Sequence, residues 1–490
     1  MTDTPAPYRW RWVALFVILA AEVMDLLDSL VTNVAAPAIR ADVGGGESTI
    51  QWLGAAYTLA MAIGLITGGR LGDIFGRRRM YLIGAVGFTL GSIACGIAQS
   101  PAQLIAARVA QGLLGAVMLP QGFGMLKEMF SEKEQATAFG MFGPVMGLST
   151  VGGPILAGWL VDTDLLGAGW RMIFLINIPL GLFAVAGGLA FLPEWKSARA
   201  VRLDLVGALL AAVGSALIVF PLVQGREHGW PAWAFGLIAL ALAVFGVFAW
   251  YESRISRAGR DPLVEPTLFR KRGFSGGMVL GLVFFTAMSG FWLTFSLYTQ
   301  IGLHYSPTKA GLVGIPASVG MVVAFVASQG LARFGRRVMH GGLVAMAAGV
   351  GGVVVTLGLA GEQVTPWQLV PALAVTGLGM GFVMAPFFDS VLASVDAHET
   401  GSASGTLTSV QQLGAALGSA ILGTVFFERI KVDDFVRAEQ FTLGVEIAMI
   451  AVVFAAVFLL PRHARPHDGA PVEGRDEPSG VAAESAKVPA

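Results

Sequence analysis

Apolar segments of about 20 residues recur along the whole chain, and short polar stretches separate them. An α-helix of ~20 apolar residues spans the ~30 Å hydrocarbon core of a bilayer. We predict fourteen such helices, near residues 12–36, 50–68, 80–99, 102–126, 137–161, 172–192, 203–223, 232–251, 275–300, 310–330, 340–360, 367–390, 404–426 and 441–460. The pattern therefore predicts an all-α protein that crosses a membrane many times.

The first apolar segment, 12–36, follows basic residues, as the core of a signal peptide does. It continues well past signal-peptide length and shows no clear cleavage site. We therefore expect it to stay in the mature chain as the first transmembrane helix.

The Lys and Arg residues are divided unequally between the two sets of loops. An even number of helices puts both termini on one side, where the loops and tails carry 24 Lys and Arg, against seven in the other loops. Because basic loops stay in the cytoplasm, we expect cytoplasmic termini. Residues 1–11 and 252–274 are then a cytoplasmic tail and loop, and residues 462–490, rich in Pro, Gly, Glu and Ser, form a disordered cytoplasmic tail.

Composition excludes several classes of protein. Hydrophobic residues make up 55% of the chain and charged residues 13%. The 32 basic residues balance the 32 acidic ones, which gives no reason to expect a nucleic-acid partner, and one cysteine, Cys95, allows no disulfide framework. No Gly-Lys dipeptide occurs, so the P-loop pattern is missing. Six scattered histidines predict no metal site, and we expect neither an enzyme nor a cofactor.

Three acidic residues interrupt the first apolar segment: Glu22, Asp25 and Asp28. Their spacing spreads them over about 120° of the helix surface. A carboxylate costs several kcal/mol in a bilayer, so one flank of this helix should face a cavity, where the acids can exchange protons. Arg108 is the basic residue within a predicted span, and we expect it to face these acids. The alternative is that the pair is purely structural.

Two similar turns indicate an internal repeat. "GGRLGDIFGRRR" follows the second predicted helix, and "SQGLARFGRRV" follows the tenth. Repeats of this kind build the two halves of secondary transporters. Because the copies lie eight helices apart, two six-helix halves with two inserted helices fit the spacing.

Five motifs resemble those of the major facilitator superfamily, and within it the fourteen-helix drug:proton antiporters. The first is the loop signature, with Gly69, Gly72, Asp73, Gly76, Arg77 and Arg78 in place. "RVAQG" resembles the buried-arginine motif around Arg108, and Trp170 to Gly181 is similar to the entry into the sixth helix. The antiporter signature retains Gly147, Gly153, Pro154 and Gly158, with Ala157 in place of a usual glycine. "LDSLVTNVAAPAI" matches the first-helix motif at Asp28, Asn33 and Pro37, while Leu30 replaces a common threonine.

The resemblance implies the major facilitator fold, with pseudo-symmetric bundles at 12–192 and 275–461 and two inserted helices at 203–251. It implies proton coupling at Asp28, a conformational contact from Asp73 to the neighbouring half, and a fifth helix that seals the pathway. It also implies a monomer. For the fifth helix, the alternative is a plain packing face.

Further residues are candidates for the substrate cavity or for proton transfer. Aromatic and polar side chains that could line a cavity for flat cations are Asn33, Trp52, Tyr57, Gln111, Trp292, Tyr298 and Gln412. Each aromatic among them could instead serve packing or anchor the chain at the membrane interface. Asp389 is either a solvated helix end or a second proton or substrate site.

Together these patterns predict a proton-coupled exporter of lipophilic, cationic small molecules that needs no cofactor besides the proton gradient. One alternative is an exporter of a single endogenous metabolite, such as an antibiotic or siderophore. Arg outnumbers Lys 25 to 7, a bias of GC-rich bacterial genomes, so we expect a bacterial cytoplasmic membrane. A membrane sensor without transport is a third possibility, but it has no need of charges within the membrane.

Overall fold

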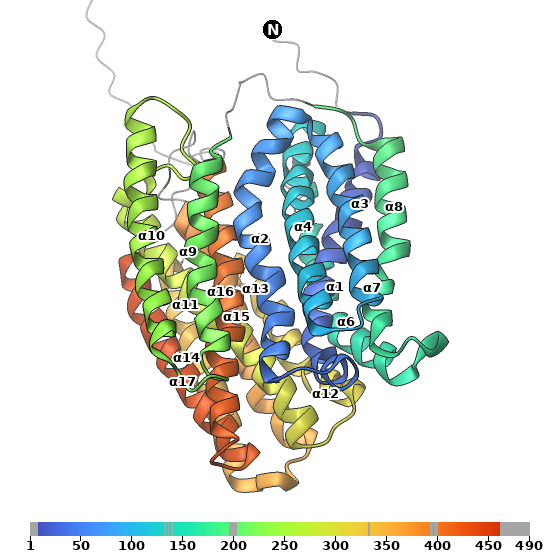
Figure 1. Ribbon diagram of the computed structural model, residues 1–490, viewed down its shortest axis with the longest axis vertical. Helices are drawn as coiled ribbons and strands as arrows, with labels where there is room; N and C mark the ends of the chain where they lie inside the picture. The colour runs from blue at the N-terminus through green and yellow to red at the C-terminus, as the bar shows by residue number, and fades with distance from the viewer. Residues whose placement is uncertain are drawn as a thin grey trace, which may run out of the picture.

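The chain forms a bundle of long helices in a computed structural model (Figure 1). The structure describes residues 8–131, 134–135, 137–138, 141–195, 203–331, 334–392, 395 and 400–460. No strand occurs in these ranges. The predicted tail 462–490 and residues 1–7 of the predicted N-terminal tail lie outside them.

Each predicted span corresponds to one helix or to two consecutive helices. The first part of the chain contains α1 (Arg11–Val43), α2 (Glu47–Phe75), α3 (Arg77–Gly96), α4 (Pro101–Met129), α6 (Phe142–Thr163), α7 (Met172–Leu175) and α8 (Asn177–Phe191). The middle part contains α9 (Leu205–Gln224) and α10 (Ala232–Arg257). The last part contains α11 (Arg272–Leu297), α12 (Pro307–Val313), α13 (Ile315–Gly330), α14 (Arg336–Ala360), α15 (Pro366–Leu392), α16 (Thr400–Arg429) and α17 (Phe435–Ala456).

Thirteen segments of the described chain are long and apolar enough to cross a membrane. Helix α1 is not among them, because its apolar stretch contains Glu22, Asp25 and Asp28. The predicted total of fourteen therefore depends on α1, whose 33 residues are more than long enough to span a bilayer.

Two predicted spans are broken by proline. The span 172–192 divides into α7 and α8 at Ile176, and the span 310–330 divides into α12 and α13 at Gly314. Pro179 and Pro316 have no N–H to donate to the carbonyls four residues earlier, in the last turn of α7 and of α12. The helix in each span is therefore interrupted where this backbone hydrogen bond cannot form.

The described chain begins at one end of the bundle, which we call the terminal end and where α2 and α8 end and α3 and α9 begin (Figure 1, top). There the amide of Tyr8 donates to the carbonyl of Met129, and the amide of Arg77 donates to that of Trp195. We call the other end of the bundle, where α6 ends and α12 begins, the opposite end.

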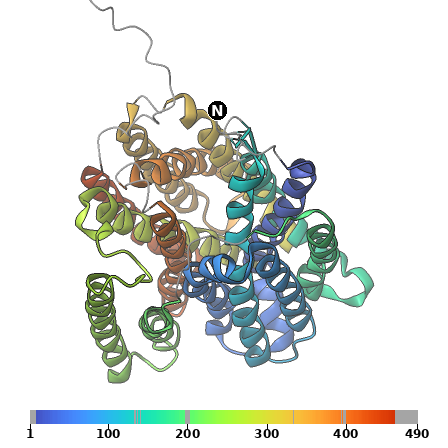
Figure 2. The same cartoon turned by 90° about the horizontal axis from the view of Figure 1, so that it is seen from above.

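The helices form two groups, α1–α8 and α11–α17, that meet along three contacts (Figure 2). These contacts join α2 to α16, α6 to α12 and α13, and α1 to α11 and α12. Helices α9 and α10 lie at the edge of the bundle, where α9 packs on both α2 and α16, and α10 packs on α9.

Helix α9 covers the seam between α2 and α16. Its Val219 and Val223 pack on buried apolar residues of both helices, among them Leu59 and Ala416. Beneath it, Gln51 Nε2 of α2 donates to the carbonyls of Ser419 and Ala420 and to the Thr424 hydroxyl, each at 3.1 Å. The Thr424 hydroxyl donates in turn to the carbonyl of Leu222 at 2.9 Å. Beyond the end of α9, Arg226 pairs with Glu47 at the start of α2.

Helix α6 approaches α12 closely at the opposite end. A methyl group on Gly158 would overlap the backbone of Pro307 and Thr308, and one on Gly311 would overlap the carbonyl of Pro154. Asp162 Oδ2 accepts a hydrogen bond from the amide of Thr308 at 3.0 Å. Small residues therefore let the two groups of helices touch backbone to backbone there.

The other residues of the antiporter signature lie on neighbouring faces of α6. Gly147 faces Val322 of α13, and Gly153 faces Leu27 and Leu30 of α1. The signature thus lies where α6 meets α1 and the second group of helices.

We expect Gly158→Ala to destabilise the protein by about 1–3 kcal/mol, because the added methyl group has no space against α12. Gly152→Ala is the matched control, since nothing lies within 4 Å of the position that its methyl group would occupy. The control should be neutral or stabilising, because Ala favours helix by up to ~1 kcal/mol over Gly. Thermal unfolding of both purified variants tests the contact, and equal unfolding temperatures would contradict it.

Candidate functional site

An ion pair between Asp28 of α1 and Arg108 of α4 is buried in the first group of helices. Both side chains are fully buried. Arg108 Nη1 donates to Asp28 Oδ2 and, at 2.8 Å, to Gln111 Oε1. Arg108 Nε donates to the carbonyl of Leu53 at 3.0 Å. The predicted contact between Arg108 and the acids of α1 is present in the structure.

Two amide side chains complete the surroundings of Asp28. Its Oδ1 accepts from Gln111 Nε2 at 2.8 Å and from Asn177 Nδ2 at 3.0 Å. The hydroxyl of Ser92 accepts from the same two amides, at 2.8 and 3.1 Å. Burying an ion pair is favourable only when such hydrogen bonds satisfy its remaining lone pairs and protons. Four helices, α1, α3, α4 and α8, therefore meet at Asp28.

Asn177 and Ser92 were not identified from the sequence. Asn177 is a lone amide in the apolar stretch "MIFLINIPLG", which was a usable signal. Ser92 lies in a helix with many small residues, "GFTLGSIACG", and nothing in the sequence distinguishes it.

Asp25 lies one turn from Asp28 and has its own partner. The Tyr57 hydroxyl of α2 donates to Asp25 Oδ1, and the Arg108 guanidinium lies over the Tyr57 ring, 4.2 Å from its centre. Glu22, a further turn toward the terminal end, is half-buried. The Arg108 guanidinium thus pairs with the last acid of a row of three that runs toward the terminal end.

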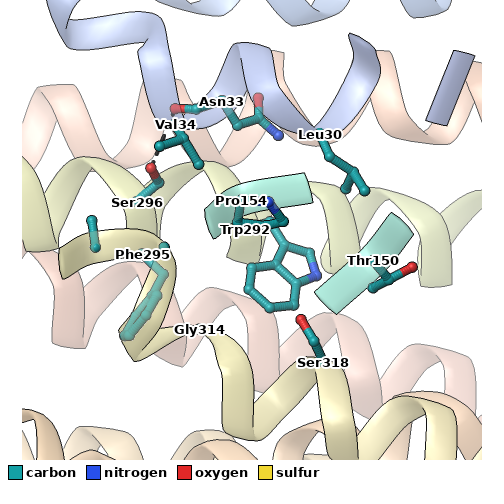
Figure 3. Close-up of a pocket in the computed structure, with 12 residues that line it drawn as sticks. Leu30, Asn33, Val34, Thr150, Pro154, Trp292, Phe295, Ser296, Gly314 and Ser318 are labelled. Atoms are coloured by element: carbon teal, nitrogen blue, oxygen red, sulfur yellow. Dashed lines mark hydrogen bonds between the residues drawn. The ribbon is translucent and has the colours of Figure 1, made fainter. Parts of the chain in front are cut away.

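A small pocket lies between the two groups of helices, at their contact through α1, α6 and α11 (Figure 3). Its free volume is about 40 Å³. The pocket is lined by Leu30, Asn33, Val34, Thr150, Pro154, Trp292, Phe295, Ser296, Ala310, Gly311, Gly314 and Ser318. The Trp292 indole lies across its centre, and the hydroxyl of Ser318 lies close beside the ring (Figure 3).

Helix α1 separates this pocket from the ion pair. Leu30 lines the pocket and follows Asp28 by two residues, which places the two side chains about 200° apart around the helix. The acids therefore face the interior of the first group of helices in this structure. The acids of α1, which we predicted to face a cavity, therefore do not line this pocket.

Two residues of the predicted cavity set, Asn33 and Trp292, line the pocket, and five lie elsewhere. Tyr57 and Gln111 belong to the ion-pair network, because both face inward from α2 and α4. Trp52 packs on Phe220 of α9. Tyr298 is buried in a π-helical turn after α11, and Gln412 is half-buried on α16. Asp389 is exposed on α15.

The loop motif between α2 and α3 is held within the first group of helices. Asp73 pairs with Arg77 at 2.9 Å, and Arg78 Nε donates to the carbonyl of Gly188 in α8 at 3.2 Å. Gly76 has a φ of 103°, a conformation that favours glycine, and it separates the two helices. Gly72 packs on Gln121 of α4, and Gly69 packs on Pro120.

The contact from this motif to the next part of the chain comes from Arg70. Its guanidinium donates to the backbone carbonyls of Asp261, Pro262 and Leu263, in the loop before α11. From the sequence we expected a contact with the neighbouring half from Asp73, whose ion pair with Arg77 stays inside the motif. A longer, basic side chain reaches backbone carbonyls that a carboxylate cannot bind.

Comparisons with known proteins agree with this architecture. The family model described as Major Facilitator Superfamily matches residues 18–419. The chain is 52% identical to a "Probable actinorhodin transporter" of Streptomyces coelicolor, over 86% of this chain and 74% of that protein. It is 36% identical to "Puromycin resistance protein pur8" of Streptomyces alboniger, over 86% and 82% of the two chains. It is 33% identical to "Multidrug resistance protein Stp" of Mycobacterium tuberculosis, over 82% and 73%.

Solved structures show the same fold at low sequence identity. A bacterial homologue of the human drug peptide transporters PepT1 and PepT2 aligns with a TM-score of 0.63 and 13% identity, over 92% of this chain and 97% of that one. A POT family transporter in complex with a thioalcohol-conjugated peptide aligns with a TM-score of 0.65 and 17% identity, over 91% and 96%. The helix bundle, the loop motif, the buried ion pair and the family match agree: the chain belongs to the Major Facilitator Superfamily, a family of membrane transporters.

Proposed function

We propose that this chain exports lipophilic, cationic small molecules in exchange for protons. The observation that carries this proposal is the buried carboxylate of Asp28, paired with Arg108 on a helix whose other side lines the pocket. Transport would occur by alternating access between the bundles 12–192 and 275–461, with the two inserted helices, 203–251, at their edge.

Protonation of Asp28 would act directly on α1. A proton on the carboxylate removes the charge that pairs with Arg108, and breaking one partner of a buried ion pair costs about 3–5 kcal/mol. Helix α1 also packs on α6 and α11, and it supplies Leu30, Asn33 and Val34 to the pocket. The proton and the substrate would therefore bias the same helix from opposite sides, without competing for one carboxylate.

Glu22 and Asp25 would carry protons between Asp28 and the terminal end. Successive acids in this row are three residues apart, a rise of about 4.5 Å along the helix. Tyr57 binds Asp25 and touches Arg108, so it joins the middle acid to the ion pair. We place the terminal end in the cytoplasm of a bacterium, where the basic residues Arg70, Arg77 and Arg78 favour it.

The pocket would have to enlarge to hold a drug-sized molecule. Its free volume of about 40 Å³ has room for a few water molecules, whereas drug-sized ligands fill roughly 300–1,000 Å³. Pro154 and Gly311, which line the pocket, belong to the close contact of α6 with α12, so rocking of the bundles would enlarge the pocket by separating these helices. Trp292 would bind a flat cation through its ring face, which contributes up to about 2 kcal/mol when water is excluded.

A second candidate is a dedicated exporter of one antibiotic. The observation that favours it is the set of relatives, which includes proteins named for actinorhodin, puromycin and tetracenomycin C. A dedicated exporter would transport one of these compounds and leave unrelated lipophilic cations behind. Transport of puromycin and of ethidium by the same purified protein separates the two candidates.

We expect Asp28→Asn to abolish proton-driven transport. In liposomes with an imposed pH gradient, ethidium accumulation should fall at least about tenfold, the effect of losing ~1.4 kcal/mol of coupling. Asp25→Asn and Glu22→Gln should slow transport less, because neither acid contacts Arg108 by an ion pair. Asp42→Asn is the control, an exposed acid at the other end of the same helix. Wild-type transport by Asp28→Asn would contradict the proposal.

The ion pair also predicts a pattern in stability. Arg108→Met should destabilise the protein by about 3–5 kcal/mol, because it leaves a buried carboxylate without its charge partner. The double variant Arg108→Met with Asp28→Leu should recover most of that loss, since no buried charge remains in the pair. Unfolding in detergent measures both variants. If the double variant is as unstable as the sum of the two single variants, the pair is not coupled in this way.

A further inference from the structure

Two glutamates of α17, Glu439 and Glu446, are buried in the second group of helices. Their side chains are 0% and 1% exposed. They are seven residues apart, which is two helical turns, so they lie on one face of α17. All four carboxylate oxygens lack a hydrogen-bond partner among the residues that the structure describes.

The helices around these acids offer no counter-charge. Helices α11, α14 and α16 pack against α17, and their segments 273–297, 341–360 and 402–427 contain no Asp, Glu, His, Lys or Arg. Charged groups occur near the ends of these helices: Arg272, Arg336, Arg337 and His340 at the terminal end, and Glu362, Glu428, Arg429, Lys431, Asp433, Asp434 and Arg437 at the opposite end. The cations of that end have other acidic partners, since Arg429 pairs with Asp433, Lys431 with Glu428 and Arg437 with Asp434.

An unpaired carboxylate in this position would be costly. Removing one charge from water costs several kcal/mol in a real protein interior, and a neutral acid avoids that cost. The neutral acid still has polar atoms without partners, at about 1–3 kcal/mol for each unsatisfied group. Two leucines would fill the same space without this penalty, so the acids weaken the state in which they are buried.

A third polar group points to the same place. The Tyr298 hydroxyl is fully buried without a hydrogen-bond partner in the described chain, and Glu439 is among the acidic groups near it. Tyr298 begins a π-helical turn that packs on α17, and such turns are frequent at functional sites. It directly follows α11, which supplies Trp292, Phe295 and Ser296 to the pocket.

We propose that Glu439 and Glu446 form a second proton-binding site, in the bundle that does not contain Asp28. Both acids hold protons in the arrangement described here, and they release them when α11 and α17 separate and water enters. Their protonation would then act on α11 as that of Asp28 acts on α1. The role in transport rests on the proposed function, whereas proton binding itself does not.

Infrared spectroscopy of the full-length protein in lipid bilayers tests proton binding without any transport. At pH 7, Glu439→Gln and Glu446→Gln should each remove one carbonyl band of a protonated carboxylic acid. The control Glu428→Gln, at a partly exposed acid paired with Lys431, should remove a carboxylate band instead. If a glutamine variant fails to fold, the corresponding Glu→Asp variant keeps the carboxyl group and shifts its band. Loss of carboxylate bands from both α17 variants would overturn the proposal.

Transport at steady state tests proton release. In liposomes with the membrane potential held at zero, each coupled proton multiplies ethidium accumulation about tenfold per unit of pH gradient. Glu439→Gln or Glu446→Gln should lower the wild-type ratio by about that factor, and Glu428→Gln should leave it unchanged. Unchanged ratios in both α17 variants would overturn the release step and with it the proposal. If the wild type does not accumulate ethidium, the proposed function fails, and the infrared result alone decides the proton site.

Discussion

The ion pair between Asp28 and Arg108 fixes how the first group of helices can be assembled. A guanidinium and a carboxylate are stable inside a membrane protein only if nearly every donor and lone pair is bound. Here the partners come from α2, α3, α4 and α8, so these helices must be in place around α1 before the pair is favourable. The position of α1 is consequently fixed on two sides. Its charged side chains bind groups in its own bundle, and its apolar side chains pack on the other bundle.

Most of the fold could be predicted from the sequence, because a bilayer demands long apolar helices and leaves few alternatives. Each predicted span contains a helix of the structure, and the relatives confirm the family that the motifs indicated. The breaks at Ile176 and Gly314 were missed although Pro179 and Pro316 mark them, since an apolar window does not register a missing N–H. The count of fourteen and the division of the chain stay predictions.

Less of the site was predictable, because a hydrogen-bond network depends on which helix faces which. Arg108 could be expected to face the acids of α1, because the membrane makes unpaired charges costly, whereas Asp28 was singled out among those acids by the family resemblance. The amide of Asn177 and the hydroxyl of Ser92 come from helices whose order in space the sequence does not state. Aromatic residues such as Trp52 and Trp292 look alike in sequence, yet one packs on α9 and the other lies in the pocket.

The position of α9 has a consequence for how molecules dissolved in the lipid could reach the space between the bundles. On the side of α2 and α16, α9 covers the junction between the two groups of helices, which is buried at Ala55 and Ala420. On the side of α6 and α13, residues such as Leu148 and Val326 are 76% and 60% exposed. Any lateral path from the bilayer to the space between the bundles would therefore have to open on the side of α6 and α13, because α9 packs over the junction of α2 and α16.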